Sequence, residues 1–347
     1  MEDDGHDGWY TKKGGGSTGA GLDFPPTNRL IPPPRAPRAA DTPNDNNPAP
    51  MRTAGLALNR PKHWIKNVVV LAPLVFAKEM LDPAQAWTAF RAFCAFCLTA
   101  SAVYILNDIA DREADRRHPE KKNRPIASGA VTTLQALAIL AFLLGLDVLL
   151  CVTLNAKFTI LLSLYFVLNL AYSWKLKEVM LLDVGVIAAG FMLRVLGGAY
   201  AIGVQVSSWI VLCSMFISLF LGFAKRRGEL VHFALTGETA PRTVLRRYSL
   251  VFLDQMLTIA AAATIIAYAL YTVAPRTIEI FGTDRLIYTT VFVIYGVFRY
   301  LFLIHSGEKA ESPTNALTTD MPILVNGVLW ILACVYFIYF RGALAGF

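Results

Sequence analysis

Residues 92–117 read AFCAFCLTASAVYILNDIADREADRR and join an apolar run to a charged one. The first part carries no charge, whereas three aspartates, Asp108, Asp111 and Asp115, follow within nine residues. A transmembrane helix needs about 20 predominantly apolar residues to cross a bilayer. The stretch therefore predicts a membrane span that ends in a cluster of carboxylates at the membrane surface.

The same apolar character recurs along the chain. Its 347 residues are 55% hydrophobic and only 16% charged, against about 25% charged residues in soluble domains. This composition excludes a soluble Rossmann or TIM-barrel enzyme and a disulfide-linked secreted module. The expected fold is all-α, a polytopic membrane protein with a single bundle of nine transmembrane helices, at about 65–78, 86–107, 131–152, 157–174, 179–202, 207–224, 250–273, 286–304 and 321–340.

The N-terminal segment has a different composition. Residues 1–50 contain nine prolines and seven glycines, and such a segment cannot bury enough apolar surface to offset the entropy of ordering. We therefore predict two parts, a disordered cytoplasmic tail at 1–58 and a membrane domain at 59–347.

Basic residues are divided unevenly among the predicted loops. The loops after the second, fourth, sixth and eighth segments hold fifteen Lys and Arg, and the other four loops hold Lys78, Lys157, Arg276 and Arg285. Because Lys and Arg gather on the cytoplasmic side, the N-terminus and the aspartates are predicted to be cytoplasmic. The net charge of +7 favours anionic lipid or a phosphorylated substrate over nucleic acid, since it sits in short loops between spans.

The three aspartates share one face of a helix. At 100° per residue, all three fall within an arc of about 60°. Their mutual repulsion is relieved by a divalent cation, and carboxylates that leave room for phosphate oxygens suit Mg²⁺. We count Asn107, which precedes the run, with the three aspartates as the candidate catalytic group. The alternative is a solvated helix end, with Arg112, Arg116 and Arg117 as counter-ions.

A basic loop follows at residues 116–129, RRHPEKKNRPIASG. Metal-binding carboxylates beside clustered Lys and Arg are typical of a diphosphate site. Arg116, Arg117 and Arg124 are therefore candidates to contact a diphosphate, or alternatively lipid headgroups. A positive-inside loop alone explains the charge of this segment but not the neighbouring aspartates.

These residues carry a family resemblance. The run Asn107-Asp108-x-x-Asp111-x-x-x-Asp115, followed by Arg124-Pro125-Ile126-Ala127-Ser128-Gly129, resembles the UbiA superfamily of intramembrane prenyltransferases, over about residues 60–340. This resemblance implies a bundle of nine transmembrane helices, with an active site that faces the cytoplasm and opens laterally to lipid.

One motif separates this chain from most of that superfamily. Most members transfer a prenyl group from a diphosphate to an aromatic acceptor, and carry a second aspartate-rich motif after the sixth helix. Here that place reads Lys225-Arg226-Arg227-Gly228-Glu229, and cations cannot hold a second Mg²⁺. This segment resembles that of the decaprenyl-phosphate phosphoribosyltransferase branch. The resemblance also includes Arg60–Asn67, Tyr172–Lys177, Asp183 and Arg194.

That branch implies the expected function. It is the Mg²⁺-dependent transfer of 5-phosphoribosyl from phosphoribosyl pyrophosphate (PRPP) to a polyprenyl (decaprenyl) phosphate. The products are pyrophosphate and a polyprenyl-phosphoryl 5-phosphoribose, a precursor of the lipid-linked arabinose donor for cell-envelope glycans. The expected location is the bacterial plasma membrane. The substrate-binding candidates are Lys62, Lys66, Arg116, Arg124, Tyr172, Lys175, Lys177, Asp183, Arg194, Lys225, Arg226 and Glu229.

Several alternatives stay open. One is prenyl transfer from a polyprenyl diphosphate to an aromatic acceptor, and another is a non-enzymatic lipid carrier. A transporter should show paired broken helices at mid-membrane, whereas the polar groups here gather on one face. Asp183 and Arg194, eleven residues apart, share a helix face and could line one cavity, but structural bracing explains Arg194 equally well. No pattern in the sequence sets the oligomeric state or the lipid chain length.

Overall fold

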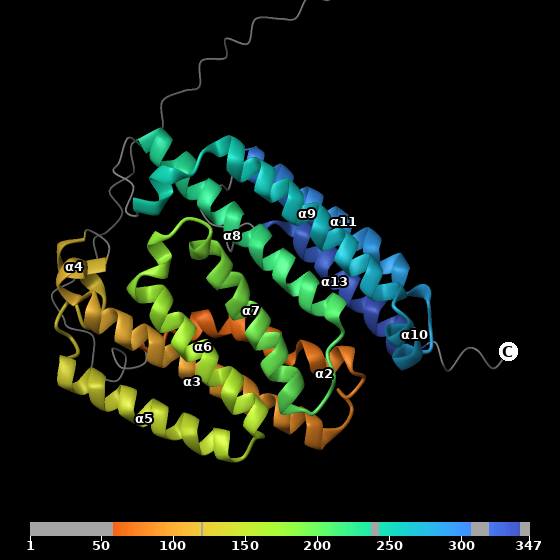
Figure 1. Cartoon of the computed structure of the whole chain (residues 1–347), viewed down its shortest axis with the longest axis horizontal. Coiled ribbons are helices and arrows are strands. Elements are labelled where there is room, and N and C mark those ends of the chain that lie inside the picture. Colours follow the sequence, from red (N-terminus) through yellow and green to blue (C-terminus); the bar gives the residue numbers. More distant parts are fainter. Residues whose placement is uncertain (1–57, 119–120, 237–242, 307–318, 341–347) are drawn as a thin grey trace, which may run out of the picture. The chain divides into compact units, whose positions relative to one another are not determined.

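The computed structural model describes residues 58–118, 121–236, 243–306 and 319–340. These residues form helices and connecting turns, with no β-strand among them (Figure 1). The predicted tail lies outside the described residues except for Leu58, which is 1% exposed and packs against Ala102 and Ile105. The packed part of the chain therefore includes the residue at the end of the predicted tail.

Eight helices in the described part of the chain are long and apolar enough to cross a membrane. They are α3 (Pro83–Ala110), α5 (Thr133–Val152), α6 (Ala156–Trp174), α7 (Leu182–Ala201), α8 (Ser208–Thr236), α9 (Leu250–Val273), η5 with α11 (Arg285–Thr289, Thr290–His305) and α13 with η6 (Met321–Val335, Tyr336–Phe340). The first predicted segment is a shorter apolar pair, the 3₁₀ helix η1 (Pro61–Leu71) and α2 (Ala72–Phe76). The predicted helical membrane bundle is thus confirmed, and the chain is an integral membrane protein.

The long helices begin where local chemistry favours a start. Asp82 accepts a hydrogen bond from the amide of Ala84 at 2.8 Å, and Pro83 occupies the first helical position of α3. Thr132 and Gln135 form a reciprocal capping box at the start of α5. Short helices fill the connections: α4 (Arg112–Arg117), η2 (Lys121–Asn123), η3 (Leu176–Glu178), η4 (Thr243–Arg247) and α10 (Pro275–Phe281).

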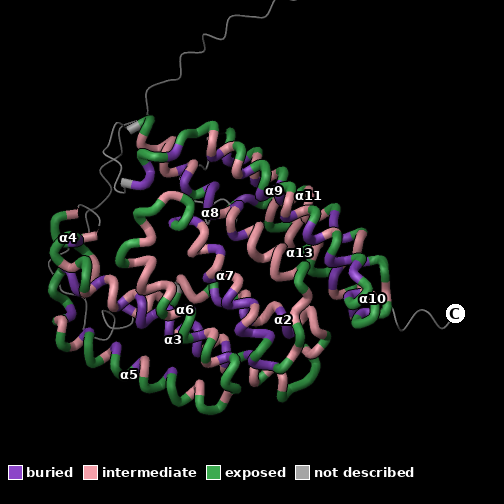
Figure 2. The backbone as a smooth tube through the Cα atoms, viewed as in Figure 1, coloured by how far each residue is buried: buried purple, intermediate pink, exposed green. Residues whose placement is uncertain are grey.

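Two helices, α3 and α7, form the buried centre against which η1 packs. Their inward faces are largely buried, whereas α5 leaves most of its length exposed, as expected for a helix that faces lipid (Figure 2). The closest approach is at Gly198 of α7, where an added Cβ would lie 1.9 Å from the carbonyl oxygen of Val70. This contact brings η1, and the residues that precede it, onto the centre of the bundle.

Two predicted boundaries were wrong, and both lie beside the candidate site. The helix predicted to end at residue 224 continues as α8 to Thr236, so residues 225–229 are helical rather than part of a loop. The aspartates are not on one unbroken helix, because α3 ends at Ala110 and α4 begins at Arg112. Asp111 lies at the junction with φ −89° and ψ 3°, and its amide still donates to the carbonyl of Asn107 at 2.8 Å.

Candidate functional site

Asp108 lies in the last turn of α3 and is held by two arginines. Its side chain is 3% exposed, and the Nη2 atom of Arg60 lies 2.6 and 2.9 Å from its two oxygens. Arg60 has a left-handed backbone, with φ 44° and ψ 58°, and its guanidinium lies 5.0 Å from the centre of the Tyr104 ring. Non-glycine residues rarely adopt this conformation. The unusual turn before η1 therefore accompanies the contact between Arg60 and Asp108.

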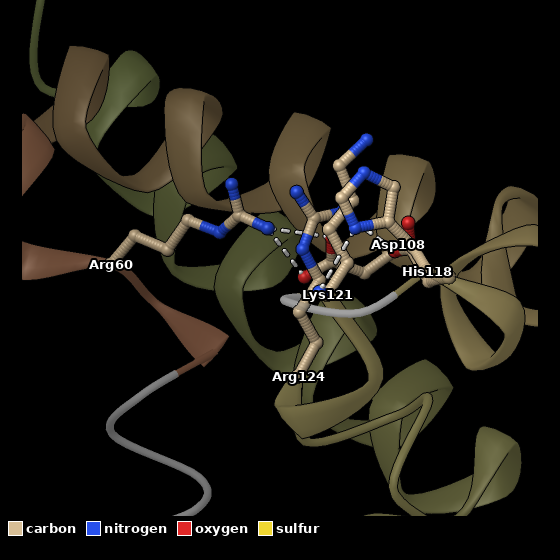
Figure 3. Close-up of polar contacts among 6 residues, drawn as sticks. Arg60, Asp108, His118, Lys121 and Arg124 are labelled. Atoms are coloured by element: carbon tan, nitrogen blue, oxygen red, sulfur yellow. Dashed lines mark hydrogen bonds and ion pairs between the residues drawn. The ribbon is translucent and has the colours of Figure 1, made fainter. Parts of the chain in front are cut away.

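Arg124 connects two of the predicted metal ligands. Its Nη1 atom lies 2.6 Å from Oδ2 of Asp115 and 3.2 Å from Oδ1 of Asp108. Figure 3 shows Arg60 and Arg124 reaching Asp108 from different segments, beside His118 and Lys121. Arg124 and Asp115 are nine residues apart, whereas Arg60 and Asp108 are 48 apart. Local and distant segments therefore meet at these carboxylates.

The loop that carries Arg124 is anchored by apolar burial. Ile126, two residues later, is 1% exposed and packs in the cluster between α3 and α5. Arg116 donates from Nε to the carbonyl of Ala127 at 3.1 Å, and Gly129 turns the chain with φ +83°. The Arg-Pro-Ile-Ala-Ser-Gly segment is thus a docked turn that fixes Arg124 in place.

The alternative expectation was that Arg112, Arg116 and Arg117 are the counter-ions of the aspartates, and the structure gives Arg112 and Arg116 a different partner. Arg112 and Arg116 pair instead with Glu113, at 2.7 and 3.3 Å. The hydrogen bond from Arg112 lowers the pKa of Glu113 below its usual value, with Arg116 adding to the effect. Asp111 is exposed to solvent at the junction between α3 and α4.

The carboxylates at this site supply some of the oxygen ligands that a Mg²⁺ ion needs. In the described ranges, no three acidic, histidine or cysteine side chains converge as a complete metal-ligand group. Two carboxylates do converge, because Asp108 and Asp115 both contact one nitrogen of Arg124. Mg²⁺ is often bound by one or two carboxylates plus substrate phosphates and water. The residues present therefore suit a Mg²⁺ ion whose coordination is completed by a diphosphate.

A second cluster lies between α7 and α8 and is more deeply buried. Arg226 and Asp183 are 1% and 0% exposed and form an ion pair at 2.8 Å, and Arg226 also pairs with Glu229. Tyr248 donates to Asp183 at 2.6 Å and accepts from the amide of Leu181 at 2.8 Å. Burial, and then the bond to Asp183, raise the pKa of Tyr248. Arg226 is thus neutralised within the protein.

Arg194 belongs to a third group. Its Nε donates to Oδ1 of Asn67 and its Nη2 to the hydroxyl of Tyr165, both at 2.7 Å. The guanidinium also lies 4.7 Å from the centre of the Tyr165 ring. These contacts tie α7 to η1 and α6. Arg194 and Asp183 therefore take part in separate clusters, and the contacts of Arg194 are those of a brace.

The remaining predicted cations line the same end of the bundle. Lys66, Lys175 and Lys225 are exposed, Lys177 is half-buried, and neither Lys175 nor Lys177 pairs with an acid in the described ranges. The pKa of His63 is lowered by burial and then by three cations, Lys66, Arg60 and Lys225. Cations in and just before η1 and on α8 thus act on the same imidazole. Asn107 and Tyr172 are half-buried, and the side chain of Lys62 lies outside the described residues.

Sequence reasoning missed four residues of these clusters: Arg60, Asn67, Tyr165 and Tyr248. Arg60 and Asn67 bound the basic segment that opens the first helix, so their composition offered a signal. Tyr165 and Tyr248 gave none, because the first looks like an ordinary aromatic residue in the middle of α6 and the second like one just before α9. Each is identified only by the charged group that it contacts.

Comparison with known proteins shows which family this chain resembles. The model of the UbiA prenyltransferase family matches residues 68–324. A decaprenyl-phosphate phosphoribosyltransferase of Corynebacterium glutamicum is 32% identical over 288 residues, covering 81% of this chain and 85% of the relative. The enzyme of that name from Mycolicibacterium smegmatis is also 32% identical, covering 81% and 91%.

A solved structure shares the fold. It is a UbiA homolog from Archaeoglobus fulgidus bound to GPP and Mg²⁺, with a TM-score of 0.61 and 19% identity, covering 82% of this chain and 99% of that one. The resemblance expected from the aspartate run and from the Lys225-Arg226 segment is therefore confirmed. The family model and the two phosphoribosyltransferase relatives match most of the chain, and the structure is a helical bundle. Together, these findings show that this chain belongs to the UbiA prenyltransferase family.

Proposed function

We propose that this chain is a membrane phosphoribosyltransferase, which transfers 5-phosphoribosyl from PRPP to a polyprenyl phosphate, decaprenyl phosphate in the named relatives. The observation that carries the proposal is the placement of Arg226. It pairs with the buried Asp183 and the half-buried Glu229, so that Asp108 and Asp115 are the converging carboxylates left for a metal among the described residues. One Mg²⁺ beside many cations suits a donor and an acceptor that are both phosphorylated.

The reaction exchanges one C–O bond for another. The bond between C1 of the ribose and the pyrophosphate oxygen breaks, and a bond from C1 to an oxygen of the lipid phosphate forms. Pyrophosphate leaves with the electron pair, and C1 gains oxocarbenium character. Because the attacking phosphate is already an anion, the protein needs no strong base. In-line attack predicts inversion at C1.

Charge and position are then what the protein must supply. Asp108 and Asp115, with Asp111 and Asn107 beside them, would hold Mg²⁺, which would supply positive charge to the leaving pyrophosphate. Arg60 and Arg124 contact the same carboxylates and are placed to reach that diphosphate.

Exposed cations serve the other phosphates. We assign Lys62, Lys66, Arg116, Lys175, Lys177 and Lys225 to the 5-phosphate of the donor and to the lipid phosphate. Arg226, Asp183 and Glu229 hold α7 against α8. Tyr172 lies in the last turn of α6, three residues before Lys175. Arg194 braces the first helix.

A transfer assay tests this function. The purified full chain is given labelled PRPP and decaprenyl phosphate in detergent, with Mg²⁺ or with EDTA. Label should enter the organic phase only with Mg²⁺. If folded protein transfers no label from PRPP but prenylates 4-hydroxybenzoate from a polyprenyl diphosphate, the proposal is wrong and the aromatic prenyltransferase alternative replaces it.

We also propose that the protein lies in the bacterial plasma membrane with the aspartate end in the cytoplasm, as the excess of basic residues at this end supports. A cysteine at Glu113 should resist a membrane-impermeant maleimide applied to intact cells, whereas a cysteine at Thr283, at the other end of the bundle, should react. The reverse labelling would refute this orientation.

A further inference from the structure

A cavity lies at the end of the bundle opposite the aspartates. Helix α7 begins beside Asp183 and runs to Ala201, about 28 Å away along its axis at 1.5 Å per residue. Beyond that end, the link at 204–207, the end of α2, and α10 enclose a cavity of about 380 Å³. The proposed transfer reaction does not use this space.

The lining of the cavity is amphipathic. Its floor includes Phe76, Ile210 and Tyr271, and Arg276 is the charged residue among its lining residues. Arg276 is exposed and donates from Nη1 to Oε1 of Gln205 at 2.8 Å. An amide oxygen orients the guanidinium but does not neutralise it, and no acidic residue lines the cavity. The cavity therefore combines an apolar interior with a positive charge at its rim that has no acidic neighbour among the lining residues.

A second hollow extends this surface. It shares residues 204–206 with the first and is lined by Lys157, whose ammonium lies 5.8 Å from the centre of the Tyr200 ring. Asn155 fixes this corner, since its amide donates to the carbonyls of Tyr200 and Ala201 at 2.5 and 3.4 Å. Two cations, Lys157 and Arg276, thus flank one short segment between α7 and α8.

We propose that this surface binds one anionic membrane phospholipid, with its phosphate at Arg276 and part of an acyl chain on the apolar floor. The site lies at helix ends, where lipid headgroups meet the protein and where long basic side chains reach the membrane interface. A soluble anion would leave the apolar floor unfilled, and a zwitterionic lipid would bring a quaternary ammonium close to Arg276 together with its phosphate. The cavity size lies in the range that binds small ligands.

Native mass spectrometry of the full chain tests the proposal. The protein is titrated with phosphatidylglycerol or phosphatidylcholine of the same acyl chains, and bound lipids are counted. We expect one saturable phosphatidylglycerol, bound at least tenfold more tightly than phosphatidylcholine. Arg276→Gln should abolish the preference and Arg276→Lys should keep most of it, while Lys157→Gln should weaken it.

Arg112→Gln is the matched control, because Arg112 is a partly exposed arginine at the other end of the bundle. It should leave both the lipid count and the preference unchanged. Equal binding of the two lipids by the wild-type protein would overturn the proposal. So would an unchanged preference in folded Arg276→Gln protein, or equally tight binding of an uncharged polyprenol that displaces phosphatidylglycerol. None of these readouts depends on phosphoribosyl transfer.

Discussion

Arg60 and Asp108 are 48 residues apart in the sequence, yet the Nη2 atom of Arg60 lies 2.6 and 2.9 Å from the two carboxylate oxygens of Asp108. The carboxylate is almost fully buried, so its charge depends on the cations around it. A buried carboxylate with replaceable cationic partners is suited to exchange one of them for a metal ion.

Asp108→Asn should therefore remove activity without unfolding the protein. The amide keeps the shape of the side chain but loses the charge that attracts Mg²⁺. We expect turnover to fall by about 100-fold or more, measured as label transferred from PRPP to lipid, with an unchanged elution volume in size-exclusion chromatography. Glu113→Gln is the control, because Glu113 is exposed and its ion pairs within the described residues are with neighbouring arginines. Full activity in Asp108→Asn would refute the metal assignment.

Metal binding should depend on the diphosphate. Arg124 lies between Asp108 and Asp115, so that a metal ion alone must compete with a guanidinium. A diphosphate offers that guanidinium a new partner and gives the metal more oxygen ligands. We expect the affinity for Mn²⁺, measured by electron paramagnetic resonance, to rise at least tenfold when pyrophosphate is added.

Arg124→Gln tests the cause of this coupling. Without the guanidinium, Mn²⁺ alone should bind more tightly and pyrophosphate should add less. If wild-type protein binds Mn²⁺ equally well with and without pyrophosphate, Arg124 does not compete for these carboxylates. Because the readout is binding, it holds whether or not PRPP is the donor.

Lys225 and Arg226 are neighbours in the sequence but should respond differently to substitution. Arg226 is buried between Asp183 and Glu229, whereas Lys225 is exposed. Removing one partner of a buried ion pair costs roughly 3–5 kcal/mol, so Arg226→Met should lower the midpoint of thermal unfolding sharply. Lys225→Gln should leave that midpoint within about 1–2 °C, yet raise the KM for PRPP or for the lipid phosphate. The opposite pattern would show that Arg226 is the phosphate ligand.

The sequence predicted the membrane helices well because their signal is local. Apolar runs set the spans, and residues such as Asp82 and Thr132 mark where the helices begin. The end of α8 was missed because the charged residues from Lys225 onward resemble a loop. In the structure they are helical, and Arg226 pairs with Glu229 one turn later in the same helix.

The partners of the site residues could not be predicted in the same way. The aspartates stood out as a motif, but their counter-ions were sought among adjacent arginines. Arg124 is brought in by burial of Ile126 in a turn, and Arg60 by the packing of η1 against α7. Both effects depend on tertiary contacts, and no local pattern encodes the distance between Arg60 and Asp108.

That packing gives the last prediction, at Gly198. A Cβ there would lie 1.9 Å from the carbonyl oxygen of Val70, and backbone cannot yield as a flexible side chain does. We expect Gly198→Ala to destabilise the protein by about 1–3 kcal/mol or more, and to reduce turnover because η1 carries the segment that delivers Arg60 to Asp108. Thermal unfolding in detergent and the transfer assay measure the two effects.

Gly145→Ala supplies the matched control. Gly145 lies inside α5, where an added Cβ meets nothing within 4 Å, and alanine favours a helix over glycine by up to about 1 kcal/mol. This variant should unfold at the same temperature as the wild-type protein or slightly above it, with unchanged turnover. If Gly198→Ala behaved in the same way, η1 could not be packed against α7 as closely as described, and the route by which Arg60 reaches Asp108 would have to be different.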